Sequence, residues 1–118
     1  KKSNINYVLN YNPEEEQYDA MVCLEVIEHM TRNQALTLLS QMCLMTRDYG
    51  LVFVSTPKRV KNSSENRKKY HIHEYTIDEF KEDLESVFGR VLVFSQIDET
   101  IGTFNYNAAW NYLAICMV

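Results

Sequence analysis

Glycine and proline are scarce in this sequence of 118 residues, which has only three glycines and two prolines. The glycines, Gly50, Gly89 and Gly102, are isolated from one another. This spacing excludes a glycine-rich loop that could approach a nucleotide or phosphate closely. Long hydrophobic runs are also missing, since none approaches the ~18 residues of a membrane span, and the sequence shows no signal peptide. We therefore expect a globular protein without a membrane partner.

Cysteine is rare and odd in number. Cys23, Cys43 and Cys116 lie far apart, and each is embedded in apolar sequence. This pattern favours buried, reduced thiols over disulfides or a zinc knuckle. It predicts a reducing, cytoplasmic location.

The composition is that of one globular domain, with 46% hydrophobic and 24% charged residues. A chain of this length buries roughly two-thirds of its unfolded surface, which is enough for a single core. Although the net charge is −4, the segment 58–69 contains six of the twelve basic residues and one acidic residue. Such a basic segment on an acidic body either binds an anionic ligand or is simply a solvated loop.

The hydrophobic pattern alternates between strands and helices. Thr31 with Gln34, and Thr76 with Glu79, have the form of capping boxes, which predict two helices that end near Arg47 and at Gly89. Four apolar runs predict strands buried in a sheet, and a weaker run at 5–9 predicts a short additional strand. The four runs are Tyr18–Leu24, Leu51–Ser55, Val91–Ser95 and Trp110–Val118. This order predicts an α/β sheet with right-handed crossovers, in which the last strand pairs back on an earlier one.

Polar residues gather where the first of these strands ends. Glu25, Glu28 and His29 would share one face of a helical turn, and His71 and His73 come just before the second helix. Ligands of such sheets bind beyond the carboxyl ends of the strands, so all three histidines are predicted near one rim. The group could hold a cation or supply a general base. Alternatively, the two glutamates only favour a helix start, and His29 only packs.

Three blocks of the sequence resemble the C-terminal half of class I S-adenosylmethionine-dependent methyltransferases. They are YDAMVCLEVIEHM (18–30), GLVFVSTPKR (50–59) and YHIHEYTIDEFKEDLESVF (70–88). The resemblance implies a partial Rossmann-like sheet that contains strands 4, 5, 6 and 7 of the family, with two helices and an antiparallel last strand. Residues 1–118 would then form a single, partial methyltransferase-like domain.

The resemblance also implies roles for individual residues. Cys23, Leu24 and Glu25 would lie beside the donor, S-adenosylmethionine, and His29 or His71 would act as the catalytic base. Residues that would contact the acceptor are Thr56, Lys58, Arg59 and His73. The leading interpretation is therefore transfer of a methyl group to an oxygen or nitrogen of a small, anionic molecule, without a metal.

Two alternatives remain. Enzymes that methylate the 2′-hydroxyl at the 3′ end of small RNAs use the same E-x-x-E-H spacing as a divalent-metal site, for which the ligands here would be Glu25, Glu28, His29 and His71. We rank this alternative second, because EVIEH is common without metal and no further RNA-binding feature is apparent, so nucleic acid is not the expected partner. The chain could also be a non-catalytic binding or assembly module.

The family's donor-binding half has no counterpart in the sequence. The glycine-rich loop and the acidic residue that holds the donor ribose are both missing. In the family strand order, 3-2-1-4-5-7-6, the strand at 18–24 would then present an open apolar edge. The short strand at 5–9, a second copy in a homodimer, or a missing N-terminal half would have to cover this edge.

Overall fold

The structure is a computed structural model that describes residues 17–118. It contains one mixed sheet, with the strands in the order β1-β2-β5-β3-β4. The predicted strand at 5–9 lies outside the described residues. The strands are β1 (Tyr18–Leu24), β2 (Thr46–Pro57), β3 (Arg90–Ile97), β4 (Thr100–Gly102) and β5 (Asn111–Met117). The helices are α1 (Arg32–Met45), α2 (Glu65–Tyr70) and α3 (Ile77–Val87), and there are two 3₁₀ turns, η1 (Ile27–His29) and η2 (Tyr106–Ala108).

The sheet topology confirms the predicted partial Rossmann-like sheet. β1 and β2 are parallel, whereas β5 lies between β2 and β3 and is antiparallel to both. The described strands thus follow the predicted order 4-5-7-6, and the unpredicted β4 extends the far edge by pairing with β3. The described residues therefore form a partial Rossmann-like sheet whose last strand along the chain, β5, is antiparallel to its neighbours.

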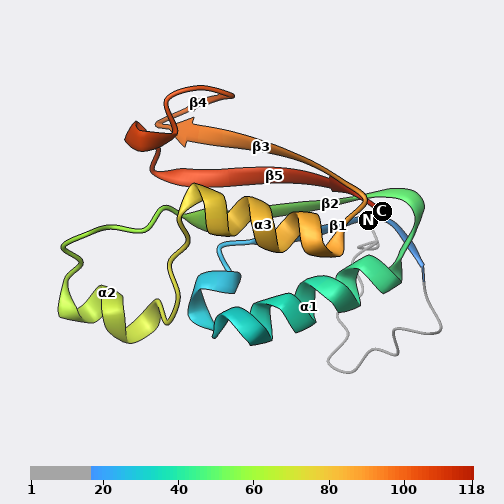
Figure 1. Ribbon diagram of the computed structural model, residues 1–118, viewed down its shortest axis with the longest axis horizontal. Coiled ribbons are helices and arrows are strands. Elements are labelled where there is room, and N and C mark those ends of the chain that lie inside the picture. Colours follow the sequence, from blue (N-terminus) through green and yellow to red (C-terminus); the bar gives the residue numbers. More distant parts are fainter. Residues whose placement is uncertain (1–16) are drawn as a thin grey trace, which may run out of the picture.

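Helices α1 and α3 cover one face of this sheet, and α2 projects from one end as a separate lobe (Figure 1). Both predicted capping boxes form, at Thr31 and at Thr76. α1 ends at Met45, close to the predicted end near Arg47, and Arg47 itself belongs to β2. The core between helices and sheet includes Ala35, Leu39, Met42, Phe80 and Leu84 from the helices and Val52, Val54, Ala114 and Cys116 from the strands.

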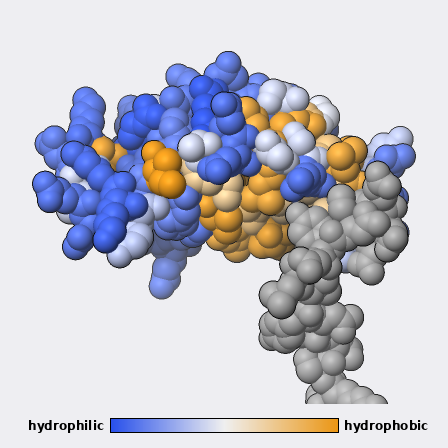
Figure 2. All heavy atoms as spheres, turned by 90° about the horizontal axis from the view of Figure 1, so that it is seen from below, coloured by the Kyte–Doolittle hydropathy of each residue, from blue (hydrophilic) through white to orange (hydrophobic). Residues whose placement is uncertain are grey.

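The opposite face of the sheet carries no helix in the part that the structure describes. β1 is therefore buried on one face only, contrary to its apolar sequence, and Val22 and Leu24 are 62% and 50% exposed. An apolar groove of about 580 Å³ runs along this face, and Figure 2 shows an apolar patch beside the hydrophilic lobe. The groove is lined by Val22, Leu24, Phe53, Phe94, Ile101, Leu113, Ala114 and Ile115.

The three cysteines lie within the described residues as free thiols. Cys23 and Cys116 are buried, as expected, whereas Cys43 is only partly buried. No helix of the described residues is long and apolar enough to cross a membrane.

Gly50 lies at an irregularity between β1 and β2, where the register shifts between Tyr18 and Ala20. A Cβ at this position would stand 2.8 Å from the carbonyl oxygen of Arg47 and 2.9 Å from that of Asp19. Because these atoms are backbone, they cannot rotate away. Gly50→Ala should therefore lower the free energy of unfolding by about 1–3 kcal/mol, measured by urea denaturation.

The matched control is Gly89→Ala. A Cβ there would meet only the carbonyl oxygen of Met117, at an ordinary 3.7 Å. We expect a smaller loss than for Gly50→Ala. Equal losses for the two variants would contradict the crowded approach of β1 to Gly50.

Candidate functional site

The candidate site lies at the rim where β1 and β2 end together. Leu24 pairs with Ser55 in the parallel ladder, so the residues that follow both strands emerge side by side. At the same rim, Pro57 at the end of β2 pairs with Asn111 at the start of β5. The 3₁₀ turn η1 and the segment before α3 also reach this rim, since the backbone N–H of His73 donates to the carbonyl of Glu28 at 3.1 Å.

Glu25, the residue after β1, has a backbone in the left-handed region, with φ of 53°. Its backbone N–H donates to the carbonyl of Ser55 at 3.1 Å, and its carboxylate accepts a hydrogen bond from the Ser55 hydroxyl at 2.8 Å. The helical turn begins only at Ile27. The expected single helical face with Glu25, Glu28 and His29 is therefore not formed, because the positive φ at Glu25 interrupts it.

Glu28 is almost completely buried, with 1% of its surface exposed. Its carboxylate accepts a hydrogen bond of 3.4 Å from the hydroxyl of Thr56, which is itself fully buried. Burial raises the pKa of Glu28 above its ordinary value, and the nearby charge of Glu25 adds to this effect. A buried carboxylate is costly unless a cation or several hydrogen bonds compensate it.

His29 and His71 face each other at the edge of this carboxylate. Their ring centroids are 5.0 Å apart in an edge-on arrangement. His29 Nδ1 lies 2.7 Å from the carbonyl oxygen of Tyr70, and His71 Nδ1 lies 2.8 Å from Oε1 of Glu74. Because both partners only accept hydrogen bonds, Nδ1 is the donor in each ring, and in the neutral form of the ring the lone pair lies on Nε2.

Glu28, His29 and His71 bring one possible ligand atom each within 4.8 Å of one another. Two imidazoles and a carboxylate form a donor set that suits first-row divalent cations. The contacts of the two Nδ1 atoms with a carbonyl and a carboxylate also match the usual support of metal-binding histidines. Glu25, the fourth predicted ligand, is not part of this group.

Cys23 and Leu24, both predicted to lie beside the donor, point to opposite faces of the sheet and differ in exposure. Cys23 is buried, and burial together with the charge of Glu28 raises the pKa of its thiol to about 11. The thiol is therefore uncharged at neutral pH and a poor nucleophile. Leu24 points to the uncovered face of the sheet and is half exposed. Their contact with a donor stays a prediction.

The residues predicted to contact the acceptor are held by backbone and carboxylate groups. Lys58 donates to the carbonyl of Asn107, and Arg59 pairs with Glu79 at 2.8 Å. His73 Nε2 lies 3.4 Å from Glu79 but makes no hydrogen bond among the described residues. Thr56 would have to be uncovered before it could touch an acceptor.

Several residues of the rim were not predicted from the sequence. Glu74 holds both His71 and Arg67 through the same oxygen, Oε1. Its place in the H-x-H-E segment was a usable signal, because histidines near a metal commonly pair with a carboxylate. Ser55 and the exposed Trp110 carried no such signal, since only the folded chain brings them to the rim.

Comparisons with known proteins identify the fold. No protein-family model and no curated protein sequence gives a significant match. Among solved structures, the crystal structure of small RNA methyltransferase HEN1 matches 92% of this chain with a TM-score of 0.66 and 24% identity. A chain of the Pnkp1/Rnl/Hen1 RNA repair complex matches 98% with a TM-score of 0.63 and 20% identity. A SAM-dependent methyltransferase from Archaeoglobus fulgidus matches 87% with a TM-score of 0.57 and 15% identity.

The matched parts are fractions of these proteins. The chain spans 15% of the HEN1 chain, 26% of the chain in the repair complex and 60% of the Archaeoglobus fulgidus protein. These likenesses show that the chain has the class I S-adenosylmethionine-dependent methyltransferase fold over part of its sheet.

Glu79 links the start of α3 to the basic segment. It completes the capping box with Thr76 and pairs with Arg59. Burial alone would raise the pKa of Glu79, but the N–H of Thr76 and the Arg59 guanidinium outweigh it and lower the pKa. We expect Glu79→Gln to reduce the free energy of unfolding by about 1 kcal/mol at neutral pH.

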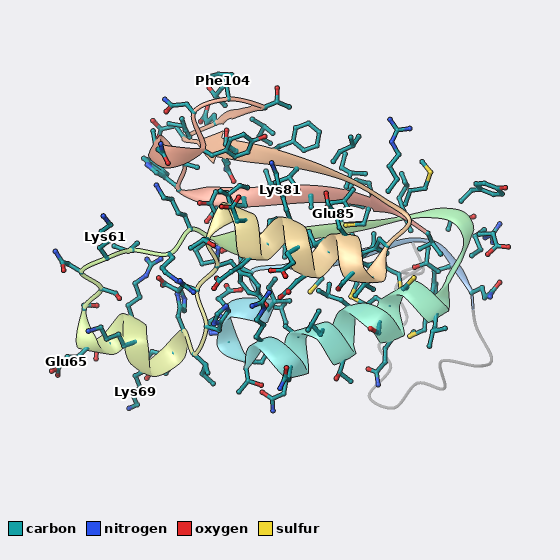
Figure 3. All side chains as sticks on the ribbon, viewed as in Figure 1. Lys61, Glu65, Lys69, Lys81, Glu85 and Phe104 are labelled. Atoms are coloured by element: carbon teal, nitrogen blue, oxygen red, sulfur yellow. The ribbon has the colours of Figure 1, made fainter. Side chains whose placement is uncertain are left out.

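The sign of the pH dependence follows from the lowered pKa of Glu79. Its charge stabilises the fold above the ordinary value of 4.5, and this stabilisation is lost as the pH falls through the lowered pKa. When urea unfolding is repeated at decreasing pH, the difference in the free energy of unfolding between Glu79→Gln and the parent should therefore become smaller. Glu85→Gln, at an exposed position of the same helix (Figure 3), is the control and should change little at any pH.

Proposed function

We propose that this chain is part of an S-adenosylmethionine-dependent methyltransferase that uses a divalent cation to methylate the 2′-hydroxyl at the 3′ end of RNA. The observation that carries the proposal is the convergence of Glu28, His29 and His71, whose candidate ligand atoms lie within 4.8 Å of one another. The likeness to a small RNA methyltransferase and to a chain of an RNA repair complex supports the same branch. This reverses the order in which the sequence alone ranked the two branches.

The residues of the rim fit a cation in charge and in orientation. Among the described residues no Lys or Arg pairs with the buried carboxylate of Glu28, and His29 Nε2 lies 3.5 Å from it. Because Nδ1 of each ring is used in a hydrogen bond, Nε2 is the nitrogen through which His29 and His71 would bind the cation. When bound, a divalent cation would supply Lewis-acid activation of a hydroxyl group. In this proposal the two histidines are ligands, and Glu74 and the Tyr70 carbonyl are positioning groups.

The donor side of the proposal rests on Cys23, Leu24 and Glu25 at the end of β1. Residues 1–118 would form one partial domain, and a half that carries the glycine-rich loop would complete the donor pocket along the open edge of β1. The leading interpretation of the sequence, a small anionic acceptor with His29 or His71 as base, is the competing function. The competing function requires no cation, so a measurement of metal binding distinguishes the two functions.

The metal proposal is tested by titrating the protein with Mn²⁺ and following the free ion by electron paramagnetic resonance. Glu28→Gln preserves the shape of the side chain but removes the charge, and should weaken Mn²⁺ binding by at least about 10-fold. The control is Glu65→Gln, the same change at an exposed position on α2 (Figure 3), which should leave binding unaltered. Unchanged Mn²⁺ binding in Glu28→Gln would contradict the proposed metal site and would favour His29 or His71 as the catalytic base.

A second test concerns the donor. Because the sequence has no glycine-rich loop, we expect calorimetry to show no heat when this polypeptide is titrated with S-adenosylmethionine. Addition of a polypeptide that carries such a loop should restore binding. Clear binding by the chain alone would mean that residues 1–118 form a complete donor site, and failure in both cases would favour a non-catalytic module.

A further inference from the structure

A second cavity, of about 470 Å³, lies on the same rim, between the end of β2 and the start of β5. Its lining combines basic side chains with one large aromatic ring, and none of its charged residues is acidic. The lining residues are Lys58, Arg59, Val60, Lys61, Arg67, Ala109 and Trp110. A cavity of this kind suits a ligand that has both an aromatic ring and a negative charge.

The backbone of Trp110 is fixed although its side chain is exposed. Its N–H donates to the carbonyl of Gln96, and its carbonyl accepts from the N–H of Lys58, both at 2.9 Å. The residue is nevertheless 59% exposed. An indole ring held in this way offers a flat face on which a nucleobase can stack with little loss of entropy.

The positive charge around the ring is only partly compensated. Arg59 pairs with Glu79, and Arg67 pairs with Glu74. Lys58 bonds a backbone carbonyl, which leaves its charge in place. Lys61 has no carboxylate within ion-pair distance in the described part of the chain, and Figure 3 shows it pointing away from the body of the protein. Lys58 and Lys61 are therefore available to a phosphate.

A single carboxylate connects this cavity to the candidate metal group. Oε1 of Glu74 accepts hydrogen bonds from Arg67, which lines the cavity, and from His71, which belongs to the metal group. A ligand in the cavity is thus adjacent to the group that would hold the cation. A chain of nucleotides can occupy both places at once, whereas a small anion would leave the indole unused.

We propose that this cavity binds a nucleotide next to the reacting 3′ end of a single-stranded RNA. The base stacks on Trp110, and Lys58 and Lys61 contact the adjoining phosphate. The inference rests on the proposed function and deepens it, because it names the part of the acceptor that the protein grips. Trp110 is then a specificity-determining residue for an unpaired acceptor end, since a base inside a duplex cannot present its face.

The only tryptophan of the chain provides a local probe. We expect a short single-stranded oligoadenylate to quench the fluorescence of Trp110 saturably, without metal or donor. Lys61→Glu should weaken RNA binding about 5-fold or more. It should also make the slope of log K against log salt concentration shallower by about 0.7 for each phosphate contact that is lost. The matched control is Arg90→Glu, at the opposite end of the sheet, which should bind RNA as the parent does.

Stacking is tested with a fluorescently labelled RNA and anisotropy. Trp110→Ala should weaken binding about 5- to 150-fold, and Trp110→Phe should restore much of it. Absence of quenching would overturn the inference, as would equal losses in Lys61→Glu and Arg90→Glu or equal affinity for a blunt duplex. Quenching that persists in Glu28→Gln while Mn²⁺ binding is lost separates this inference from the metal proposal, so either can fail alone.

Discussion

The parallel pairing of β1 with β2 is the constraint on which the rest of the rim depends. Because Leu24 lies opposite Ser55, the two strands end together, and Glu25 meets the Ser55 hydroxyl while Glu28 meets that of Thr56. Two residues of a different strand thereby orient the two acidic side chains that follow β1. A slip of one residue would turn every side chain of β1 to the opposite face of the sheet. The register therefore decides which carboxylate is buried.

The buried carboxylate of Glu28 is the most costly feature of this arrangement. A core of the same volume built from apolar side chains would be more stable, so burial of an acid within a rim of histidines is typical of a functional site. The histidines are held in turn through their Nδ1 atoms by Glu74 and a backbone carbonyl. The same Glu74 binds Arg67 and so connects the candidate metal group to the basic cavity. One acidic side chain thus links the two parts of the proposed acceptor site.

The two faces of the sheet differ in the part that the structure describes. α1 and α3 cover one face, whereas the other shows an apolar groove next to the open edge of β1. An exposed apolar face of this kind marks an interaction surface. It lies on the side where Leu24 points and where a donor-binding half would add the next strand. The chain spans only a part of each similar protein, which supports the proposal that another polypeptide segment completes the pocket.

The sequence by itself determined the two long helices, α1 and α3, the main strands and the rim to which the polar residues belong. Capping boxes and apolar runs act over a few neighbouring residues, so they are readable without the fold. It did not reveal α2 or β4, because a six-residue exposed helix and a three-residue strand have too little hydrophobic pattern.

Only the tertiary structure decided which polar groups meet. The positive φ of Glu25 separates it from Glu28, and the approach of residues 70–74 brings His71 to the ring of His29 and the N–H of His73 to the carbonyl of Glu28. The fold also places Trp110 beside Lys58. Each of these contacts joins residues more than 40 positions apart or depends on one backbone angle, and no local pattern encodes either.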